Sequence, residues 1–104
     1  MKKCVTIVYP NKQGAKFDWD YYLKKHTPMW AKLLGENKIE IRKGVGTHNG
    51  SPVHFICLLR IWVDDVDAFM TLMKEKGHHI IEDIPHYTNV EPVIQFDDVL
   101  VEGK

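Results

Sequence analysis

The chain has 104 residues, of which 44% are hydrophobic and 27% are charged, as expected for one ordinary globular domain over residues 1–104. Lysine plus arginine equals aspartate plus glutamate, 14 of each, so the formal net charge is zero. Nucleic acids and anionic membranes attract basic surfaces, and a membrane span needs an apolar run of about 18 residues, which this sequence lacks. We therefore expect neither a nucleic-acid nor a membrane partner.

The first expected strand runs from Lys3 to Tyr9, is rich in β-branched residues and ends at Pro10. Its apolar run is short and no small-residue cleavage site follows, so we interpret it as a strand rather than a signal peptide. The two cysteines, Cys4 and Cys57, each lie in a strand-like run. This placement favours reduced, buried thiols in a cytoplasmic protein over a disulfide.

Residues 17–30, FDWDYYLKKHTPMW, begin the first expected helix, which runs from Trp19 to Leu34. Asp18 is placed to cap it, and Gly35 is placed to end it in the left-handed helical conformation. Pro28 lies inside the pattern, where it removes a backbone donor and is expected to kink or split the helix.

Tyr22, His26 and Trp30 follow one another at intervals of four residues, which places a phenol, an imidazole and an indole on one helix face. A histidine on an apolar stripe is more often a structural residue than a catalyst. The phenol and the proline on the same stripe favour a functional role. Both interpretations of His26 stay open at this stage.

The middle of the chain predicts two strands. Ile39 to Val45 alternates between apolar and polar residues, and Asn49-Gly50 is a strong hairpin signal. Val53 to Val63 is apolar on both faces apart from His54 and Arg60, which is typical of a strand that is covered on both sides.

The second helix is expected to begin at Asp64, with Asp67 at its third position, and to end at Gly77. Its core-facing stripe comprises Val66, Phe69, Met70 and Met73. A short turn over residues 78–84 leads to a last strand from Thr88 to Phe96. Pro92 within that strand cannot donate to a neighbour, so the strand belongs at an edge or a bulge.

The order of strand, helix, strand, strand, helix, strand predicts an α+β, ferredoxin-like βαββαβ domain with an antiparallel sheet and both helices on one face. The strand over residues 53–63 would then expose apolar side chains on the other face. We expect a second copy to cover that face in a twofold homodimer.

The run FDWDYYLKKHTPM resembles the signature of the EthD family, an F-x-x-x-Y-Y-x-x-x-H-x-P pattern on the first helix. The ending TNVEPVIQF resembles the last strand of the same family. Phe17, Tyr22, His26 and Pro28 occupy the motif positions, whereas Trp30 is bulkier than the small aliphatic residues expected near there. The resemblance implies the fold and homodimer of the dimeric α/β-barrel superfamily.

The EthD family is named for its association with ethyl tert-butyl ether degradation. The superfamily that the resemblance implies also includes muconolactone isomerase-like enzymes, polyketide cyclases, cofactor-free quinone-forming monooxygenases and haem-degrading enzymes. Two main function classes stay open: a small enzyme, and a non-catalytic binding or accessory protein of a degradative pathway. Haem binding or degradation is the third alternative.

Histidine exchanges protons near neutral pH, and the hydroxyl of Tyr22 or of Tyr9 could hydrogen-bond a carbonyl or phenolate oxygen. We therefore predict that His26 and Tyr22 are catalytic in cofactor-free isomerisation, cyclisation, dehydration or oxidation of an apolar or aromatic small molecule. The predicted substrate-binding residues are Tyr9, Phe17, Trp30, His54 and Trp62. We expect His26 to line a cavity with a partly solvated ring.

The remaining histidines do not have the spacing of a metal site, because His78, His79 and His86 match neither a helical pair nor a C-x-x-C pattern. No metal or cofactor is therefore expected. His54 and Arg60 share one face of their strand with Trp62, and they lie either inside a dimer barrel or at a solvated edge.

Overall fold

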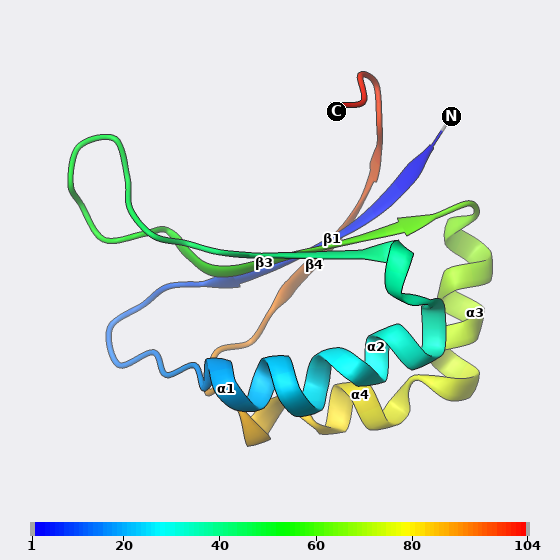
Figure 1. Cartoon of the computed structure of the whole chain (residues 1–104), viewed down its shortest axis with the longest axis horizontal. Helices are drawn as coiled ribbons and strands as arrows, with labels where there is room; N and C mark the ends of the chain where they lie inside the picture. Colours follow the sequence, from blue (N-terminus) through cyan, green and yellow to red (C-terminus); the bar gives the residue numbers. More distant parts are fainter. Residues whose placement is uncertain (1, 104) are drawn as a thin grey trace.

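The computed structural model describes residues 2–103 as a four-stranded antiparallel sheet with helices packed against one face (Figure 1). The strands are β1 (Lys3–Pro10), β2 (Ile39–Lys43), β3 (Phe55–Val63) and β4 (Val93–Asp98). Their spatial order is β2-β3-β1-β4. This arrangement confirms the α+β, ferredoxin-like fold that the sequence predicts. Within residues 2–103, no helix is both long and apolar enough to cross a bilayer.

The first helical segment comprises α1 (Trp19–Tyr21), the π-helical turn η1 (Tyr22–His26) and α2 (Thr27–Leu34), and the short 3₁₀ turn η2 (Glu36–Lys38) follows. Asp18 caps α1 as predicted, because its carboxylate accepts the N–H of Tyr21 at 3.0 Å. Gly35 has φ +101° and ψ 143°, a positive φ but not the left-handed helical conformation that was expected.

Pro28 is accommodated by the wide turn η1 and does not break the helical segment. The N–H of Thr27 donates to the carbonyl of Tyr22, five residues back. A proline ring collides with the carbonyl four residues before it in a regular α-helix, and it has no N–H to donate. The π turn before Pro28 replaces that α-helical pattern, and such turns are frequent at functional sites.

The second helical segment comprises α3 (Val66–Lys76), α4 (His78–Glu82) and the 3₁₀ turn η3 (Ile84–His86). The prediction that Asp64 caps α3 is wrong by one residue. Asp65 has the extended backbone of a cap, and its carboxylate accepts N–H groups from the first turn of the helix at 2.8 and 3.3 Å. Met70 is 53% exposed rather than part of the core.

The strand ends also differ from the predictions. β2 stops at Lys43, and β3 begins at Phe55, two residues later than expected. A long loop over residues 44–54 joins them, with the predicted turn at Asn49-Gly50, where Gly50 has φ +79°. β4 begins only after Pro92 and lies at the sheet edge, because proline cannot donate to a ladder.

The two faces of the sheet differ in composition. In β1 and β3 the odd-numbered residues face the helices, with Val5 opposite Ile61 and Ile7 opposite Leu59, all buried. The other face carries Leu58 and Trp62 together with Arg60, one of the two polar exceptions that the sequence indicates. Arg60 lies 3.9 Å from Glu40 of β2.

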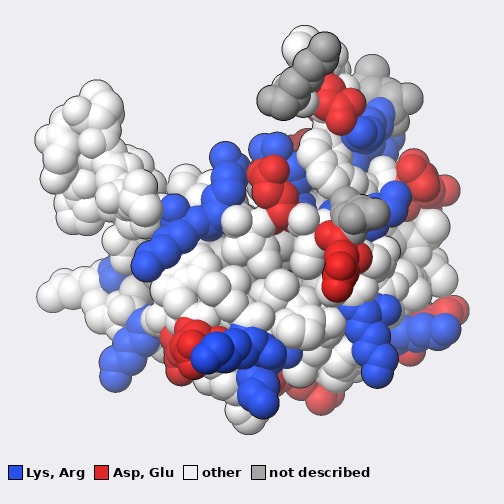
Figure 2. Space-filling view, viewed as in Figure 1, with Lys and Arg blue, Asp and Glu red and all other residues white. Residues whose placement is uncertain are grey.

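Charged side chains of both signs are interspersed over the molecular face in Figure 2, as the zero net charge leads one to expect. The projecting loop of residues 44–54 has no Lys, Arg, Asp or Glu. Cys4 and Cys57 are free, as predicted, because they lie on opposite faces of the sheet, where their thiols cannot meet.

Candidate functional site

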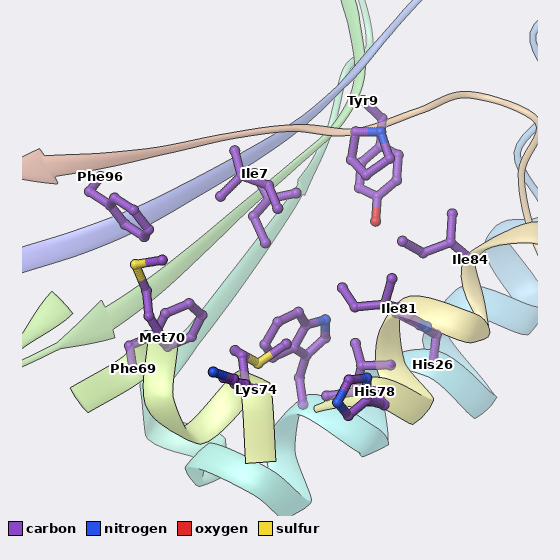
Figure 3. A pocket seen from close by; sticks show the side chains of 15 residues that line it. Ile7, Tyr9, His26, Phe69, Met70, Lys74, His78, Ile81, Ile84 and Phe96 are labelled. Carbon is purple, nitrogen blue, oxygen red and sulfur yellow. The ribbon is translucent and has the colours of Figure 1, made fainter. Parts of the chain in front are cut away.

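A cavity of about 310 Å³ lies between the helix-facing side of the sheet and the helices (Figure 3). Ile7 of β1 and Ile94 and Phe96 of β4 form part of its wall on the sheet side. Phe69 of α3 and Ile80 of α4 contribute to the opposite wall. The cavity is mostly apolar, with a few polar side chains, as is typical of a small-molecule site.

His26 lies at the end of the π turn and lines this cavity, yet its side chain is only 1% exposed. The expectation of a partly solvated ring is therefore wrong. Its Nδ1 lies 3.0 Å from Oδ2 of Asp83, and its Nε2 lies 3.4 Å from the hydroxyl of Tyr87. An ionised carboxylate only accepts, so Nδ1–H donates to Asp83 and Nε2 is left to accept from Tyr87.

The hydrogen bonds continue from His26 in both directions. The hydroxyls of Tyr87 and Tyr9 lie 2.6 Å apart, and Tyr9 lines the cavity. On the other side, the hydroxyl of Tyr21 donates to Asp83 at 2.6 Å. Figure 3 shows the hydroxyl of Tyr9 pointing into the cavity. A chain of hydrogen-bonding groups therefore joins the buried carboxylate of Asp83 to the interior of the cavity.

Burial controls the protonation states along this chain. Burial lowers the pKa of His26 more than the hydrogen bond to Asp83 raises it, so the imidazole is neutral at pH 7. Burial alone would raise the pKa of Asp83, but the hydrogen bonds from Tyr21 and His26 bring that pKa below its ordinary value. Burial also raises the pKa of Tyr9 to about 12. At neutral pH the chain thus consists of a carboxylate, a neutral imidazole and neutral phenols.

Tyr22 lies behind the cavity and does not line it. Its ring stacks on His26, with centroids 5.4 Å apart, and on Tyr87, with centroids 4.9 Å apart. Its side chain is fully buried, and its hydroxyl, next to the Cys57 thiol, makes no hydrogen bond among the described residues. Phe17 packs against Tyr9 and Tyr22 in the same aromatic cluster. These contacts position the rings of the site.

The other predicted binding residues divide into two groups. Trp30 lines the cavity, and its buried Nε1–H has no hydrogen-bond partner among the described residues. His54 and Trp62 lie elsewhere: His54 is exposed beside β3, and Trp62 is on the sheet face away from the helices. Sequence spacing did not reveal that the alternation of β3 directs Trp62 away from the cavity.

The remaining histidines are also separated by the fold. His78 lines the cavity, whereas His79 and His86 are exposed and do not. Within residues 2–103, no group of three or more His, Cys, Asp or Glu side chains is arranged to hold a metal ion.

The sequence interpretation missed Asp83 and Tyr87, both of which contact His26. The two residues lie four apart, on either side of the turn η3. The one signal for them is their position, beside Glu82, inside the otherwise apolar and histidine-rich run HHIIEDIPHY. That signal does not reveal the partner, because His26 lies 57 residues away from Asp83.

The fold and the cavity define a class, the ferredoxin-like α+β domains that enclose a pocket between sheet and helices. Comparison with solved structures identifies the family. An EthD-like protein from Ralstonia eutropha JMP134 is 32% identical over 98% of this chain and 95% of its own, with a TM-score of 0.88. The chain therefore belongs to the EthD family, as its first-helix motif indicates.

Two further solved structures share the fold. An EthD family protein from Bacillus halodurans C-125 is 16% identical over 96% of this chain and all of its own, with a TM-score of 0.76. HapK from Hahella chejuensis is 12% identical over 100% of this chain and 97% of its own, with a TM-score of 0.59. No protein-family model matches the chain, and no curated protein does.

Proposed function

We propose that this EthD protein binds an apolar or aromatic small molecule in the cavity and exchanges protons with it through side chains alone. One observation carries the proposal: the hydroxyl of Tyr9 lies in an apolar cavity and is linked to His26 by two hydrogen bonds that pass through Tyr87. Isolated polar groups in apolar cavities orient ligands, and a histidine within the same network supplies a proton acceptor. The reactions that fit are isomerisation, cyclisation, dehydration and cofactor-free oxidation, in which dissolved O₂ takes the electrons of the deprotonated substrate.

The chemistry follows from the order of the groups. In the free protein Tyr87 donates to Nε2 of His26, so the single hydroxyl proton of Tyr9 points to the oxygen of Tyr87. When a ligand binds, Tyr9 turns this proton to a carbonyl or phenolate oxygen and so stabilises negative charge that develops there. Tyr87 then donates to Tyr9, which leaves Nε2 of His26 free to accept the proton that leaves a neighbouring carbon. The imidazolium that results is stabilised by the carboxylate of Asp83, 3.0 Å from Nδ1. Of the two tyrosines that the sequence offered for the oxygen-binding role, this proposal assigns that role to Tyr9 and not to Tyr22.

Deuterium exchange at the α-carbon of 1-tetralone in D₂O, followed by proton NMR, tests the proposal. We expect the protein to accelerate exchange above the buffer rate, His26→Gln to abolish the acceleration, and Tyr9→Phe to reduce it at least about tenfold, as for loss of one transition-state donor. Tyr22→Phe is the matched control, because it removes a hydroxyl without a partner outside the cavity.

The outcomes separate the function classes. Binding without any exchange supports a non-catalytic binding or accessory protein. Loss of exchange in Tyr22→Phe but not in Tyr9→Phe would overturn the proposed roles of the two tyrosines. Absence of binding for every small apolar probe would remove the small-molecule function altogether.

We also propose that the protein is a homodimer that packs on the sheet face away from the helices. Leu58 and Trp62 give that face apolar surface. Val45 in the loop of residues 44–54 and Leu100 and Val101 near the C-terminus are 80–91% exposed. Figure 1 shows the loop and the C-terminal segment projecting from the sheet on the side away from the helices, where they would flank a second copy. Exposed apolar surface of this kind is typical of an interface.

A further inference from the structure

The polar side chains around the cavity are dominated by hydrogen-bond donors. Lys74 of α3 and His78 of α4 line its rim, and both are exposed. Trp30, with its buried and unpartnered Nε1–H, lies in the wall. No Asp or Glu is among the described residues that line the cavity. Lysine ammonium and indole groups only donate, so the cavity is complementary to a ligand rich in acceptors.

The donors are also separated along the cavity. Figure 3 shows Lys74 and His78 at the opposite side of the cavity from the hydroxyl of Tyr9, with apolar side chains between them. Tyr9 is 2% exposed, so its end is the buried one, whereas the cationic end is open to solvent. A ligand that satisfies both ends has an apolar body, an oxygen at the buried end and a negative charge at the rim.

We propose that the ligand is an aromatic or alicyclic carboxylic acid whose carboxylate lies at Lys74 and His78 while its ring system fills the cavity. This inference rests on the proposed function and specifies its substrate class. An oxygen substituent on the ring system faces the hydroxyl of Tyr9 at the buried end of the cavity, which Figure 3 shows pointing inwards. One ammonium and one imidazole match the single charge of a carboxylate. Among the described residues that line the cavity there is neither an arginine fork nor a glycine-rich loop to favour a phosphate.

A matched pair of probes tests the inference, 6-hydroxy-2-naphthoic acid and the neutral 2-naphthol. The chain has three tryptophans, so the indole N–H region of a ¹H–¹⁵N spectrum holds three signals, and Trp30→Phe assigns the one from Trp30. We expect the acid to shift the Trp30 signal, because Trp30 lines the cavity, and to bind more tightly than 2-naphthol. We expect Lys74→Glu to reduce the affinity for the acid roughly tenfold, because it reverses a charge at the rim. The affinity for 2-naphthol should stay within about twofold of the wild-type value.

Lys76→Glu is the matched control, because it makes the same charge change on the same helix at a residue that does not line the cavity. It should leave both affinities unchanged. Equal binding of the two probes, with no effect of Lys74→Glu on the acid, would overturn the carboxylate assignment and leave the small-molecule function standing. If neither probe moves the Trp30 signal at millimolar concentration, the cavity is not a binding site. The proposed small-molecule function and the carboxylate assignment then both fail.

Discussion

The hydroxyl oxygens of Tyr9 and Tyr87 lie 2.6 Å apart although 78 residues separate them in the chain. Tyr9 is near the end of β1, and Tyr87 follows η3 after the second helical segment. The backbone holds this approach in place, because the N–H of Asp18 donates to the carbonyl of Tyr87 at 2.8 Å and Phe17 forms a bridge with Thr88. The contact links the hydroxyl of Tyr9, through Tyr87, to the imidazole of His26.

Replacing Tyr87 by Phe is expected to disconnect Tyr9 from His26. The substitution removes the donor to Nε2 and the hydrogen-bond partner of Tyr9, so we expect a stability loss of about 1 kcal/mol. The ¹⁵N shifts of the His26 ring check the assignment. In the wild type they should show Nδ1 protonated and Nε2 unprotonated, and in Tyr87→Phe the Nε2 shift should move.

Tyr22→Phe is the control for this measurement, since the hydroxyl of Tyr22 makes no hydrogen bond in the described structure. A wild-type ring that is protonated at Nε2 and unprotonated at Nδ1 would contradict the assigned donors, namely Nδ1–H to Asp83 and the hydroxyl of Tyr87 to Nε2.

His26→Ala is expected to lower the free energy of unfolding by roughly 2–4 kcal/mol. The substitution enlarges the cavity and leaves the buried carboxylate of Asp83 without its imidazole donor. Urea denaturation at pH 7.5 measures the change. The double variant His26→Ala, Asp83→Asn should recover part of the loss, because it removes the uncompensated charge. A loss below about 1 kcal/mol for His26→Ala would show that the ring is not held as the structure indicates.

Stability should fall as the pH falls below about 6.5. The folded-state pKa of His26 is lowered from its ordinary value of 6.5, so the folded protein binds fewer protons than the unfolded chain in this range. The loss begins as the unfolded chain takes up its proton and stops below the folded-state pKa. Asp83, whose pKa is also lowered, adds a second loss as the pH falls below its ordinary value of 3.8 and through its folded-state pKa.

Urea denaturation midpoints from pH 8 to pH 5 measure the first of these losses. His26→Gln cannot titrate and should flatten the profile between pH 7 and pH 5. The other histidines are exposed, and His48→Gln, in the loop of residues 44–54, serves as a control that should keep the slope. An unchanged slope in His26→Gln would assign the acid sensitivity to another group.

The proposed dimer should have the mass of two 12.1 kDa chains in light scattering at micromolar concentration. Leu58→Glu places a charge on the sheet face away from the helices and should give a monomer that keeps its circular dichroism spectrum. Leu23→Glu is the control, because Leu23 is also apolar, lies in the π turn η1 and is 52% exposed. A monomeric wild type would rule out the dimer. A Leu58→Glu variant that is still dimeric would show that the interface lies on another surface.

The sequence by itself determined the order of elements, the cap at Asp18 and the edge position of the strand after Pro92. These features depend on local chemistry: strand and helix periods, side-chain oxygens that accept the first helical N–H groups, and a proline that cannot donate. The first-helix motif also indicated the family correctly. Where two neighbouring residues could serve equally, as Asp64 and Asp65 at the start of α3, local chemistry did not discriminate between them.

Only the tertiary structure decided which side chains form the site. The stripe of Tyr22, His26 and Trp30 is real, but Tyr22 stacks on Tyr87 behind the cavity, whereas Trp30 lies in the cavity wall. His26 acquires its tautomer from Asp83 and its lowered pKa from burial, and neither leaves a local signature in the sequence. Helical spacing specifies which residues share a face, whereas distant segments that close over that face determine whether each side chain meets a ligand, a hydrogen-bond partner or another ring.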